Sequence, residues 1–476
     1  MTRYDLVVLG GGAAAFAAVT EADRRDWSVA VVNAGLPLGG TCANVGCVPS
    51  KHLLDIGHTA FEPPRTPHDA VTYRDRPAVD WGRAIADTDR LVDEIRESNY
   101  RAVAEAFGTD IVRGHGRFVD ERTIRVTDGP DAGTTLTGET VLIATGSSPR
   151  RPPIEGLDAV AYETSETVLD REECPEAVVI VGGGPVGVEW AQILRHLGAT
   201  VTICQRSDRL LPGFPPALGH ALADQFAASG IDVHTEATVE RVRADDTASA
   251  PAQVLVEART GGEPLQVEGS TLFLAAGVTP NTADCGLDAA GVETRADGTV
   301  AVDETYRTST PGVFAAGDCI GAPMLETVAA REGNFAVRNA AGASRSVDHG
   351  AVPHVVYTSP PVASIGTTEA EYREDHGTCA CRTVDIADLP RAQAVGATRG
   401  SCQVVADHET RDIVGVHAIM PRADEVIAEA AMAVTHGLGV DDVIETIHPF
   451  PTFSEAFRRA CQAFERDIST MSCCVE

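Results

Sequence analysis

The chain opens with a short run of apolar residues, Leu6–Leu9, which leads through a glycine-rich turn into a helical stretch and a second apolar run at 29–32. The same order recurs later, where Val178–Val181 is followed by glycines, a helical stretch to about Leu197 and another run at 200–204. Short continuous apolar runs bounded by turns are typical of parallel strands buried on both faces. The repeat therefore predicts two βαβ units, each with its own parallel sheet.

Further elements follow from the pattern between and after these units. The sequence predicts a long helix at about 81–107, short strands with glycine turns within 111–143, and a strand at 271–276. From about residue 352 strand patterns dominate, with helices after them; these strands are expected at 352–357, 362–365, 403–407 and 413–420. The predicted fold class is α/β, with two doubly wound dinucleotide-binding (Rossmann-like) domains and an α+β C-terminal domain. The predicted segments are 1–150, 151–270, 271–348 and 349–476.

Composition narrows the classes of function. The chain has 476 residues, of which 43% are hydrophobic, so it can build two or three domains with their own cores. Its 69 acidic and 38 basic residues give a net charge of −31, which argues against binding nucleic acid, anionic membranes or acidic substrates. We expect that this charge reflects adaptation to high salt, a halophilic trait; an unusual partner is the alternative.

The sequence also indicates a compartment. No uninterrupted apolar stretch reaches about 18 residues, so no membrane-spanning segment is expected. The first residues lead straight into a strand, without room for a signal peptide, which predicts a cytoplasmic protein. Most of the 12 cysteines occur singly in strand or helix patterns and are interpreted as small buried hydrophobic residues.

The stretch 39–51 contains the residues that we expect to react. Cys42 and Cys47 lie five residues apart, and Pro49 follows where the first turn of a helix favours proline. A helix N-terminus lowers the pKa of a thiol and favours the thiolate. Lys51, the only lysine in the chain, adds positive charge one turn later. The pattern predicts a redox centre, and a structural disulfide or two buried thiols is the less favoured interpretation.

This stretch resembles the active site of the flavoprotein disulfide reductases, whose motif Gly-Gly-Thr-Cys-x-Asn-x-Gly-Cys-x-Pro-Ser-Lys it matches at every fixed position. The resemblance implies FAD at the first glycine motif, a nicotinamide nucleotide at the second, and a homodimer formed by the C-terminal domain. It also implies that Glu189 pairs with Lys51 beside the flavin, and that Asp318, in the motif 310–318, bonds the ribityl chain. A helix starting near 325–327 would direct its N–H groups at the flavin.

The predicted domains then become an FAD-binding domain (1–150 and 271–348), an NAD(P)H-binding domain (151–270) and an interface or dimerisation domain with a redox tail (349–476). The predicted cofactor-binding residues are Gly10, Gly12, Ala14, Ala15, Asn33, Gly35, Gly40, Thr41, Lys51, Ala144, Thr145, Gly146, Asp318, Glu326, Gly182, Gly184, Gly187, Arg206, Arg209 and Gly277. Asn33 stands where the pattern expects an acid for the adenosine ribose, and its amide can still bond a hydroxyl. Arg206 and Arg209 follow Gln205 where NAD sites carry an acid, which favours NADPH; exposed charges without a ligand are the alternative.

Two features near the C-terminus bear on the substrate. Cys473 and Cys474 are adjacent at the chain end, which suits capture of a soft metal ion or electron relay to a bulky disulfide. The resemblance places Phe450 where disulfide reductases carry the histidine that protonates a leaving thiolate, and without it disulfide cleavage loses roughly 10²-fold. His448, two residues earlier, either replaces that acid or is an ordinary capping or surface histidine.

Together these features favour the branch of the family that reduces mercuric ion, in a form without an N-terminal metal-binding domain. In this hypothesis NADPH reduces FAD, Cys47 is the inner thiolate and Cys42 the outer thiol. Cys473 and Cys474 of the partner subunit bind Hg(II), supplied as a thiol complex, and pass it inward. Metal ligands are therefore Cys42, Cys47, Cys473 and Cys474, and Tyr162 matches an active-site tyrosine of that branch. The alternatives are a thioredoxin-reductase-like or other disulfide reductase and a non-catalytic flavoprotein that sequesters soft metals.

Overall fold

The computed structural model describes residues 2–63, 68, 70–73, 75, 77–245 and 253–467. The chain forms two compact units. The first unit contains Met1–His52, Arg83–Arg150 and Gly277–Val347, and the second contains Leu53–Gly82, Arg151–Ala276 and Asp348–Glu476. No helix among the described residues is both long enough and apolar enough to cross a bilayer.

A seven-stranded sheet organises the first unit, in the order β3-β2-β1-β6-β5-β4 with β17 paired to β6. Its central strands are parallel, with Leu6 opposite Val29 and Leu9 opposite Ile143. These residues are buried on both faces of the sheet, which explains the continuous apolar runs in the sequence. The strands are β1 (Thr2–Leu9), β2 (Val29–Asn33), β3 (Asp110–Arg113), β4 (Gly116–Phe118), β5 (Thr123–Val126), β6 (Thr135–Ile143) and β17 (Val313–Ala315).

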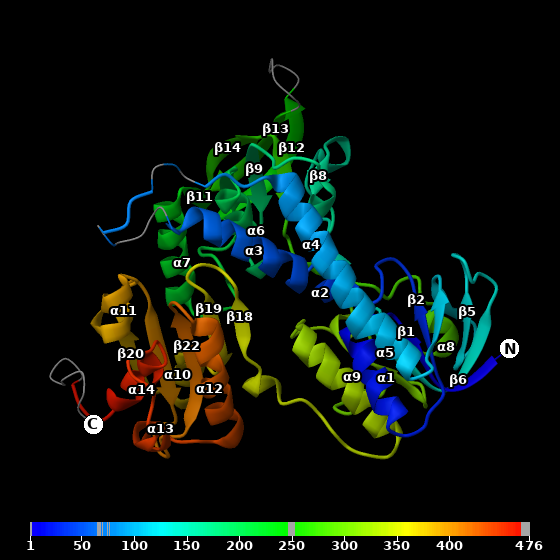
Figure 1. Ribbon diagram of the computed structural model, residues 1–476. Helices are drawn as coiled ribbons and strands as arrows, with labels where there is room; N and C mark the ends of the chain where they lie inside the picture. Colours follow the sequence, from blue (N-terminus) through cyan, green and yellow to red (C-terminus); the bar gives the residue numbers. More distant parts are fainter. Residues whose placement is uncertain are drawn as a thin grey trace. The chain divides into compact units, whose positions relative to one another are not determined.

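Two helices from opposite ends of the first unit's sequence lie side by side, α1 (Ala13–Asp23) and α9 (Glu326–Ala340), as Figure 1 shows in blue and yellow-green. Their backbones touch at Gly333, where a Cβ would lie 2.0 Å from the carbonyl oxygen of Ala14. Only glycine fits there. The remaining elements of this unit are α2 (Gly40–Asn44), the start of α3 (Cys47–Phe61), β7 (Ser147–Pro149), β16 (Val278–Pro280), α8 (Leu287–Ala290) and η5 (Asp318–Ile320).

The long helix predicted at 81–107 is interrupted in the structure. It consists of α4 (Trp81–Arg96), a π-helical turn η2 (Glu97–Arg101) and α5 (Ala102–Ala106). In the π turn Tyr100 meets Phe16 edge-on, with ring centroids 4.9 Å apart. The extra residue in the turn adjusts the helix to this contact, which hydrophobic periodicity alone does not reveal.

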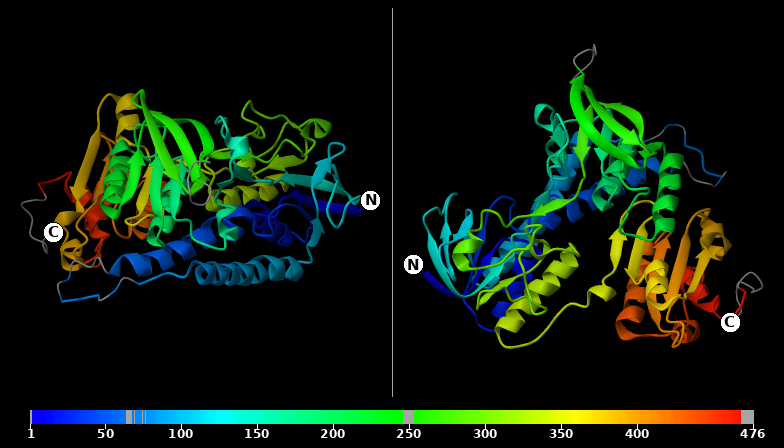
Figure 2. Two further views of the ribbon diagram at one scale, coloured as in Figure 1. Left: turned by 90° about the horizontal axis from the view of Figure 1, so that it is seen from above. Right: turned by 180° about the vertical axis from the view of Figure 1, so that it is seen from behind.

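The second unit contains a parallel sheet of order β11-β10-β9-β15-β8 and a separate antiparallel sheet β12-β13-β14, which Figure 2 shows in green. The predicted βαβ unit is confirmed as β9, α6 and β10, with Val178 opposite Val201. The three-stranded sheet is a feature that the sequence analysis did not predict. The elements are β8 (Tyr162–Glu163), β9 (Ala177–Val181), α6 (Pro185–His196), β10 (Thr200–Cys204), α7 (Pro216–Ser229), β11 (Ile231–His234), β12 (Ala237–Asp245), β13 (Gln253–Thr260), β14 (Glu263–Gly269), β15 (Thr271–Leu274), η3 (Leu157–Ala159) and η4 (Val168–Asp170).

The C-terminal part of this unit is an antiparallel sheet of order β18-β19-β22-β21-β20 with helices packed on it. All four predicted strands are present, whereas the edge strand β20 was missed because its exposed residues break the apolar pattern. These sheets confirm the predicted fold class. The elements are β18 (His354–Val356), β19 (Val362–Gly366), α10 (Glu369–His376), β20 (Ala380–Asp385), α11 (Pro390–Val395), β21 (Ser401–Ala406), β22 (Ile413–Ile419), α12 (Ala423–His436), α13 (Val440–Glu445), α14 (Glu455–Gln462), η6 (His349–Ala351) and η7 (Ile386–Asp388). The four predicted segment boundaries stay a prediction.

Candidate redox and nucleotide-binding sites

The two predicted redox cysteines lie together in the first unit. Cys42 is on the short helix α2 and is half-buried, and Cys47 opens α3 and is exposed. Both are free thiols, and their side chains are hydrogen-bonded to each other. The hydrogen bond to Cys47, burial and the nearby carboxylate of Glu326 all raise the pKa of the Cys42 thiol. The raised pKa favours the protonated form of Cys42, in agreement with its predicted role as the outer thiol. The thiolate role of Cys47, at the N-terminus of α3, stays a prediction.

Asn44 holds the backbone that carries these cysteines. Its side-chain amide donates to the carbonyl oxygens of Pro37, Leu38 and Gly40 at 3.1, 3.2 and 2.8 Å. Its side-chain oxygen accepts from Arg96 Nε on α4 at 3.0 Å. One buried amide thus satisfies several loop carbonyls, which fixes the loop between the glycines and α3.

Tyr100 is a neighbour of the redox pair that the sequence analysis missed. Burial raises the pKa of its hydroxyl to about 12, and the neighbouring Cys42–Cys47 pair and the carboxylate of Glu326 add to this shift. The hydroxyl therefore stays protonated at neutral pH and can donate a hydrogen bond. A tyrosine in a helix that looks continuous carries no sequence signal of its own, because the π turn that positions it depends on tertiary packing.

The first glycine motif forms a cradle between β1 and α1. A Cβ at Gly10 would lie 2.1 Å from the carbonyl oxygen of Ala144, so glycine lets the strand ends approach. Gly12 is the N-cap of α1, and a Cβ there would meet nothing closer than Gly40 Cα at 3.8 Å. Open space at a helix N-terminus suits a pyrophosphate. Ala14 and Ala15 are buried on α1, and Gly40 and Thr41 begin α2.

Asn33, at the end of β2, is turned toward its own loop. Its amide donates to the carbonyl oxygen of Leu36 at 3.0 Å, and its side-chain oxygen lies 2.6 Å from where a Cβ on Gly11 would be. Gly35 in that loop adopts a positive φ of 69°. The side-chain oxygen of Asn33 remains the group that can accept a bond from a ribose hydroxyl, so this role stays a prediction.

Residues that are distant in sequence meet next to the first glycine motif, from the segments 145–147, 277–281 and 318. Ser147 Oγ donates to Asp318 Oδ2 at 2.6 Å, and Asn281 donates to the carbonyl oxygen of Thr145 at 3.2 Å. Thr145 Oγ1 is buried and has no hydrogen-bond partner within the described residues. An unsatisfied hydroxyl beside an open glycine cradle fits a bound dinucleotide such as FAD. Gly146 and Gly277 both have positive φ, and Gly277 accepts from the backbone N–H of Arg150.

Glu332 supports this region and was also missed by the sequence analysis. Its carboxylate accepts from the backbone N–H of Gly317 at 2.8 Å, one residue before Asp318. Burial raises its pKa to about 7. Through its bond to Gly317, Glu332 positions the turn that carries Asp318. The sequence analysis predicted only the start of this helix, near 325–327, and not the role of Glu332.

The second glycine motif is built in the same way between β9 and α6. A Cβ at Gly182 would lie 2.3 Å from the carbonyl oxygen of Ala275, and one at Gly187 would lie 2.0 Å from the carbonyl oxygen of Gly182. Gly184 is the N-cap of α6, and a Cβ there would meet no atom within 4 Å. This cradle fits the pyrophosphate of a nicotinamide nucleotide.

Gln205, Arg206 and Arg209 follow β10, and they differ in whether their side chains are free to contact the 2′-phosphate of NADPH. Gln205 is buried and accepts from the backbone N–H of Gly183 at 2.9 Å, so it supports the glycine turn and places no acid at the ribose. Arg209 is bound to Asp208 at 2.8 Å and to the carbonyl oxygen of Pro212 at 3.3 Å. Arg206 is exposed. Of the two predicted arginines, Arg206 is the one whose guanidinium is open to a ligand.

We expect that Arg206→Ala raises the KM for NADPH about tenfold or more and leaves the KM for NADH unchanged, since a charge-assisted bond to phosphate contributes about 1.5–3 kcal/mol. Steady-state kinetics with both nucleotides measure this. Arg243→Ala, which removes another exposed arginine paired with Glu257, is the control. Equal losses with both nucleotides would refute the 2′-phosphate role.

Comparison with known proteins agrees with this geometry. The profile of the pyridine nucleotide-disulphide oxidoreductase family matches residues 4–333, and the profile of its dimerisation domain matches residues 352–461. The chain is 38% identical to the mercuric reductase of Streptomyces lividans over 99% of this chain and 98% of that one. It is 34% identical to the mercuric reductase of Lysinibacillus sphaericus over 99% of this chain and 84% of that one. The chain belongs to the pyridine nucleotide-disulphide oxidoreductase family.

A solved structure shows the same fold. The Cu(II) complex of the HOCl-induced flavoprotein disulfide reductase RclA from Escherichia coli aligns with a TM-score of 0.85 and 26% identity, over 97% of this chain and all of that one. The predicted cofactors, FAD and NADPH, are those that this family and the mercuric reductases use, which confirms that prediction. The dimerisation profile supports the predicted homodimer.

Three further residues predicted from the family resemblance can be placed. Glu189 on α6 is buried and accepts from the backbone N–H of Tyr357 at 2.9 Å. Lys51, one turn into α3, donates to Ser50 Oγ at 3.4 Å. Tyr162 on β8 is half-buried, with the guanidinium of Arg151 6.0 Å from its ring centre. Glu189 belongs to the second unit and Lys51 to the first, so their pairing stays a prediction.

His448 has two partners in the structure. Its Nε2 lies 2.6 Å from Glu429 Oε1 on α12, its Nδ1 lies 2.9 Å from the carbonyl oxygen of Thr446, and its side chain is 4% exposed. The hydrogen bond to Glu429 raises the pKa of this imidazole. Phe450, in the position of the missing acid, is 51% exposed. His448 would have to break both bonds to serve as that acid.

The His448–Glu429 pair predicts a pH-dependent stability. The folded-state pKa lies above the unfolded value of about 6.5, so the stabilisation is fully present below that value and is lost as pH rises through the folded-state pKa. We expect that His448→Gln lowers the free energy of unfolding by about 1.5 kcal/mol at pH 6 and by less at pH 9. Urea unfolding at the two pH values measures the difference. The exposed His58→Gln is the control, and a loss that does not change with pH would contradict the assignment.

The tail cysteines Cys473 and Cys474 lie outside the described residues. Their role as metal ligands therefore stays a prediction from sequence.

Proposed function

We propose that this enzyme reduces Hg(II), supplied as a complex with two small thiols, to Hg(0) at the expense of NADPH. The overall reaction consumes one NADPH and one proton for each Hg(II) dithiolate and releases NADP⁺, Hg(0) and two free thiols. Bound FAD supplies the two-electron transfer between NADPH and the sulfur-bound ion. The support comes from the redox pair and from the similarity to two mercuric reductases along almost the whole chain.

The observation that carries the proposal is the hydrogen-bonded thiol pair of Cys42 and Cys47. Two adjacent sulfurs, one of them exposed, are the ligands that a soft cation prefers. Displacement of the small thiols by Cys42 and Cys47 leaves the ion bound to the protein through two sulfurs. The raised pKa of Cys42 means that its proton is released when the metal–sulfur bond forms.

Cys473 and Cys474 of the partner subunit would receive Hg(II) first and hand it to Cys42 and Cys47 by thiol exchange. Exchange between thiolates neither oxidises nor reduces the ion, so it needs no additional reactant. The predicted homodimer provides the second chain on which this relay depends.

Disulfide reduction is the competing function, because RclA is described as a disulfide reductase. That reaction requires a proton for the leaving thiolate. Phe450 cannot supply it, and His448 is engaged by Glu429. Reduction of a metal ion needs no such proton at that position, so the site favours the metal. We place this reaction in the cytoplasm, where low-molecular-weight thiols keep catalytic cysteines reduced.

The test measures NADPH oxidation by the full-length enzyme with Hg(II) in excess small thiol, then with small and protein disulfides, while volatile mercury is collected. We expect oxidation coupled to release of Hg(0). Oxidation with disulfides alone would identify a disulfide reductase, and metal binding without oxidation would identify a sequestering protein.

The relay is tested in the same assay. We expect that Cys473→Ala/Cys474→Ala slows turnover of tightly complexed Hg(II) at least about tenfold, because the ion then has to reach the inner pair unaided. The control is Cys174→Ser/Cys285→Ser, which also removes two cysteines. Unchanged turnover in the tail variant would refute the relay through Cys473 and Cys474. It would not refute the reduction of Hg(II) at Cys42 and Cys47.

A further inference from the structure

A second pair of cysteines lies on the edge strand of the C-terminal sheet. Cys379 and Cys381 flank Ala380 at the start of β20, and the structure joins them in a disulfide with their Cα atoms 5.8 Å apart. Both are half-buried. The interpretation of most cysteines as single buried hydrophobic residues does not cover this pair, which the sequence did not single out. Cys381 belongs to β20 and Cys379 precedes the strand by one residue, and the bond between them places both sulfurs on the same side.

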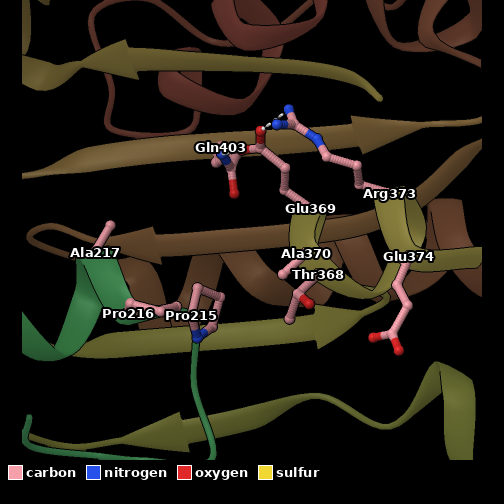
Figure 3. Close-up of a pocket in the computed structure, with 9 residues that line it drawn as sticks. All are labelled: Pro215, Pro216, Ala217, Thr368, Glu369, Ala370, Arg373, Glu374 and Gln403. Carbon is pink, nitrogen blue, oxygen red and sulfur yellow. Dashed lines mark hydrogen bonds and ion pairs between the residues drawn. The ribbon is translucent and has the colours of Figure 1, made fainter. Parts of the chain in front are cut away.

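A carboxylate from a neighbouring helix completes the group. One oxygen of Glu369, in the first turn of α10, and the sulfurs of Cys379 and Cys381 all lie within 4.8 Å of one another. Glu369 is fixed on both sides, by Arg373 at 2.7 Å and by Gln403 on β21 at 3.0 Å. Figure 3 shows Arg373 and Gln403 converging on this carboxylate. A carboxylate held in this way keeps free lone pairs for a cation and costs little further ordering.

Glu369 of this group also lines a pocket. A cavity of about 560 Å³ is lined by Glu369, Arg373, Glu374 and Gln403 on one side and by Pro215 and Pro216 on the other. The Glu374 side chain is exposed and adds negative charge. The space is large enough for a hydrated or thiol-bound ion to approach, and its charge favours a cation.

We propose that Cys379, Cys381 and Glu369 form a second binding site for a soft divalent cation, open only when the cysteines are reduced. Two molecules of a low-molecular-weight thiol reduce the disulfide, which gives two cysteine thiols and one small-molecule disulfide. Metal binding then forms two metal–sulfur bonds and releases two protons, with no change in oxidation state. Two thiolates and a carboxylate suit a thiophilic d¹⁰ ion. The site takes no part in the proposed turnover and does not depend on it.

The test uses Cd(II) as the probe, because it binds thiolates and carboxylates and is not the proposed substrate. The full-length background variant is Cys42→Ser/Cys47→Ser/Cys473→Ser/Cys474→Ser, which removes the other two pairs. The protein is reduced with dithiothreitol, freed of it by gel filtration, and equilibrated with Cd(II) in dialysis. We expect one Cd(II) per protomer, an ultraviolet thiolate-to-metal band, and weaker binding as pH falls.

Adding Cys379→Ser/Cys381→Ser should abolish both the bound metal and the band, whereas adding the control Cys174→Ser/Cys285→Ser should leave them unchanged. Glu369→Gln should weaken binding about tenfold, the scale found for groups that support a metal site. The same protein left in its disulfide form should bind none. Binding that survives loss of the pair, or absence of binding in the reduced background, would overturn the proposal.

A separate measurement keeps this site distinct from the redox centre. In the otherwise unaltered enzyme, Cys379→Ser/Cys381→Ser should leave Hg(II)-dependent NADPH oxidation within about twofold of the parent. A large loss there would place the pair in the reaction and contradict its independence.

Discussion

Cys42→Ser and Cys47→Ser should each reduce Hg(II)-dependent NADPH oxidation by roughly 10³-fold or more, the scale expected when a reacting group is removed. In the proposed reaction the hydrogen-bonded pair binds the ion through two sulfurs, and a hydroxyl is a poor ligand for a soft cation. Steady-state assays with a thiol complex of Hg(II) measure the loss.

Two controls make this result specific. The flavin content of each variant, read from its visible absorbance, should equal that of the parent, since neither side chain belongs to the glycine cradle. Cys174→Ser, at a single half-buried thiol of the second unit, should retain full activity. If either redox variant kept more than a tenth of the parent activity, the pair would not be the reducing centre.

Asn44→Ala should lower the free energy of unfolding by about 3 kcal/mol and reduce activity as well. The substitution removes a donor from three loop carbonyls and the acceptor from Arg96 Nε, and each hydrogen bond lost costs about 0.5–1.5 kcal/mol. Pro37 keeps the backbone N–H of Gly40 and Arg96 keeps Asp93, so these two groups are not left unsatisfied. Urea unfolding followed by circular dichroism measures the loss.

A matched series separates the hydrogen bonds from the packing at this position. Asn44→Asp keeps the shape but turns the donor into an acceptor that faces carbonyl oxygens, so it should destabilise at least as much as alanine. Asn99→Ala, at an exposed position on the π-helical turn, should change stability by less than about 0.5 kcal/mol. A small effect of Asn44→Asp would show that the amide donors do not hold the loop.

The pair of Cys42 and Cys47 was the most predictable part of the candidate site, because it is encoded locally. The two cysteines, the proline and the helix start are all within one short stretch, and glycine turns between apolar runs are visible in the same way. Asn44 lies in that stretch as well, but its function is to bridge to Arg96, which is 52 residues away along the chain.

Residues that act across the sequence were not predictable. Glu332 reaches Gly317 from the middle of α9, and Tyr100 reaches the redox pair through a π-helical turn. Arg206 and Arg209 look equivalent in sequence, whereas the structure ties Arg209 to Asp208 and Pro212. Glu369 and the Cys379–Cys381 pair come from a helix and an edge strand that meet only in the folded sheet.

The sequence by itself determined the α/β class and predicted the two glycine turns and the adjacent thiols of Cys42 and Cys47, because each depends on residues close together along the chain. Only the tertiary structure decided which distant side chains support these segments, such as Glu332 beside Gly317 and Arg96 beside Asn44. It also decided that Cys379 and Cys381 lie beside Glu369. The physical reason is that strand pairing and helix packing bring together side chains whose separation in sequence carries no periodic signal.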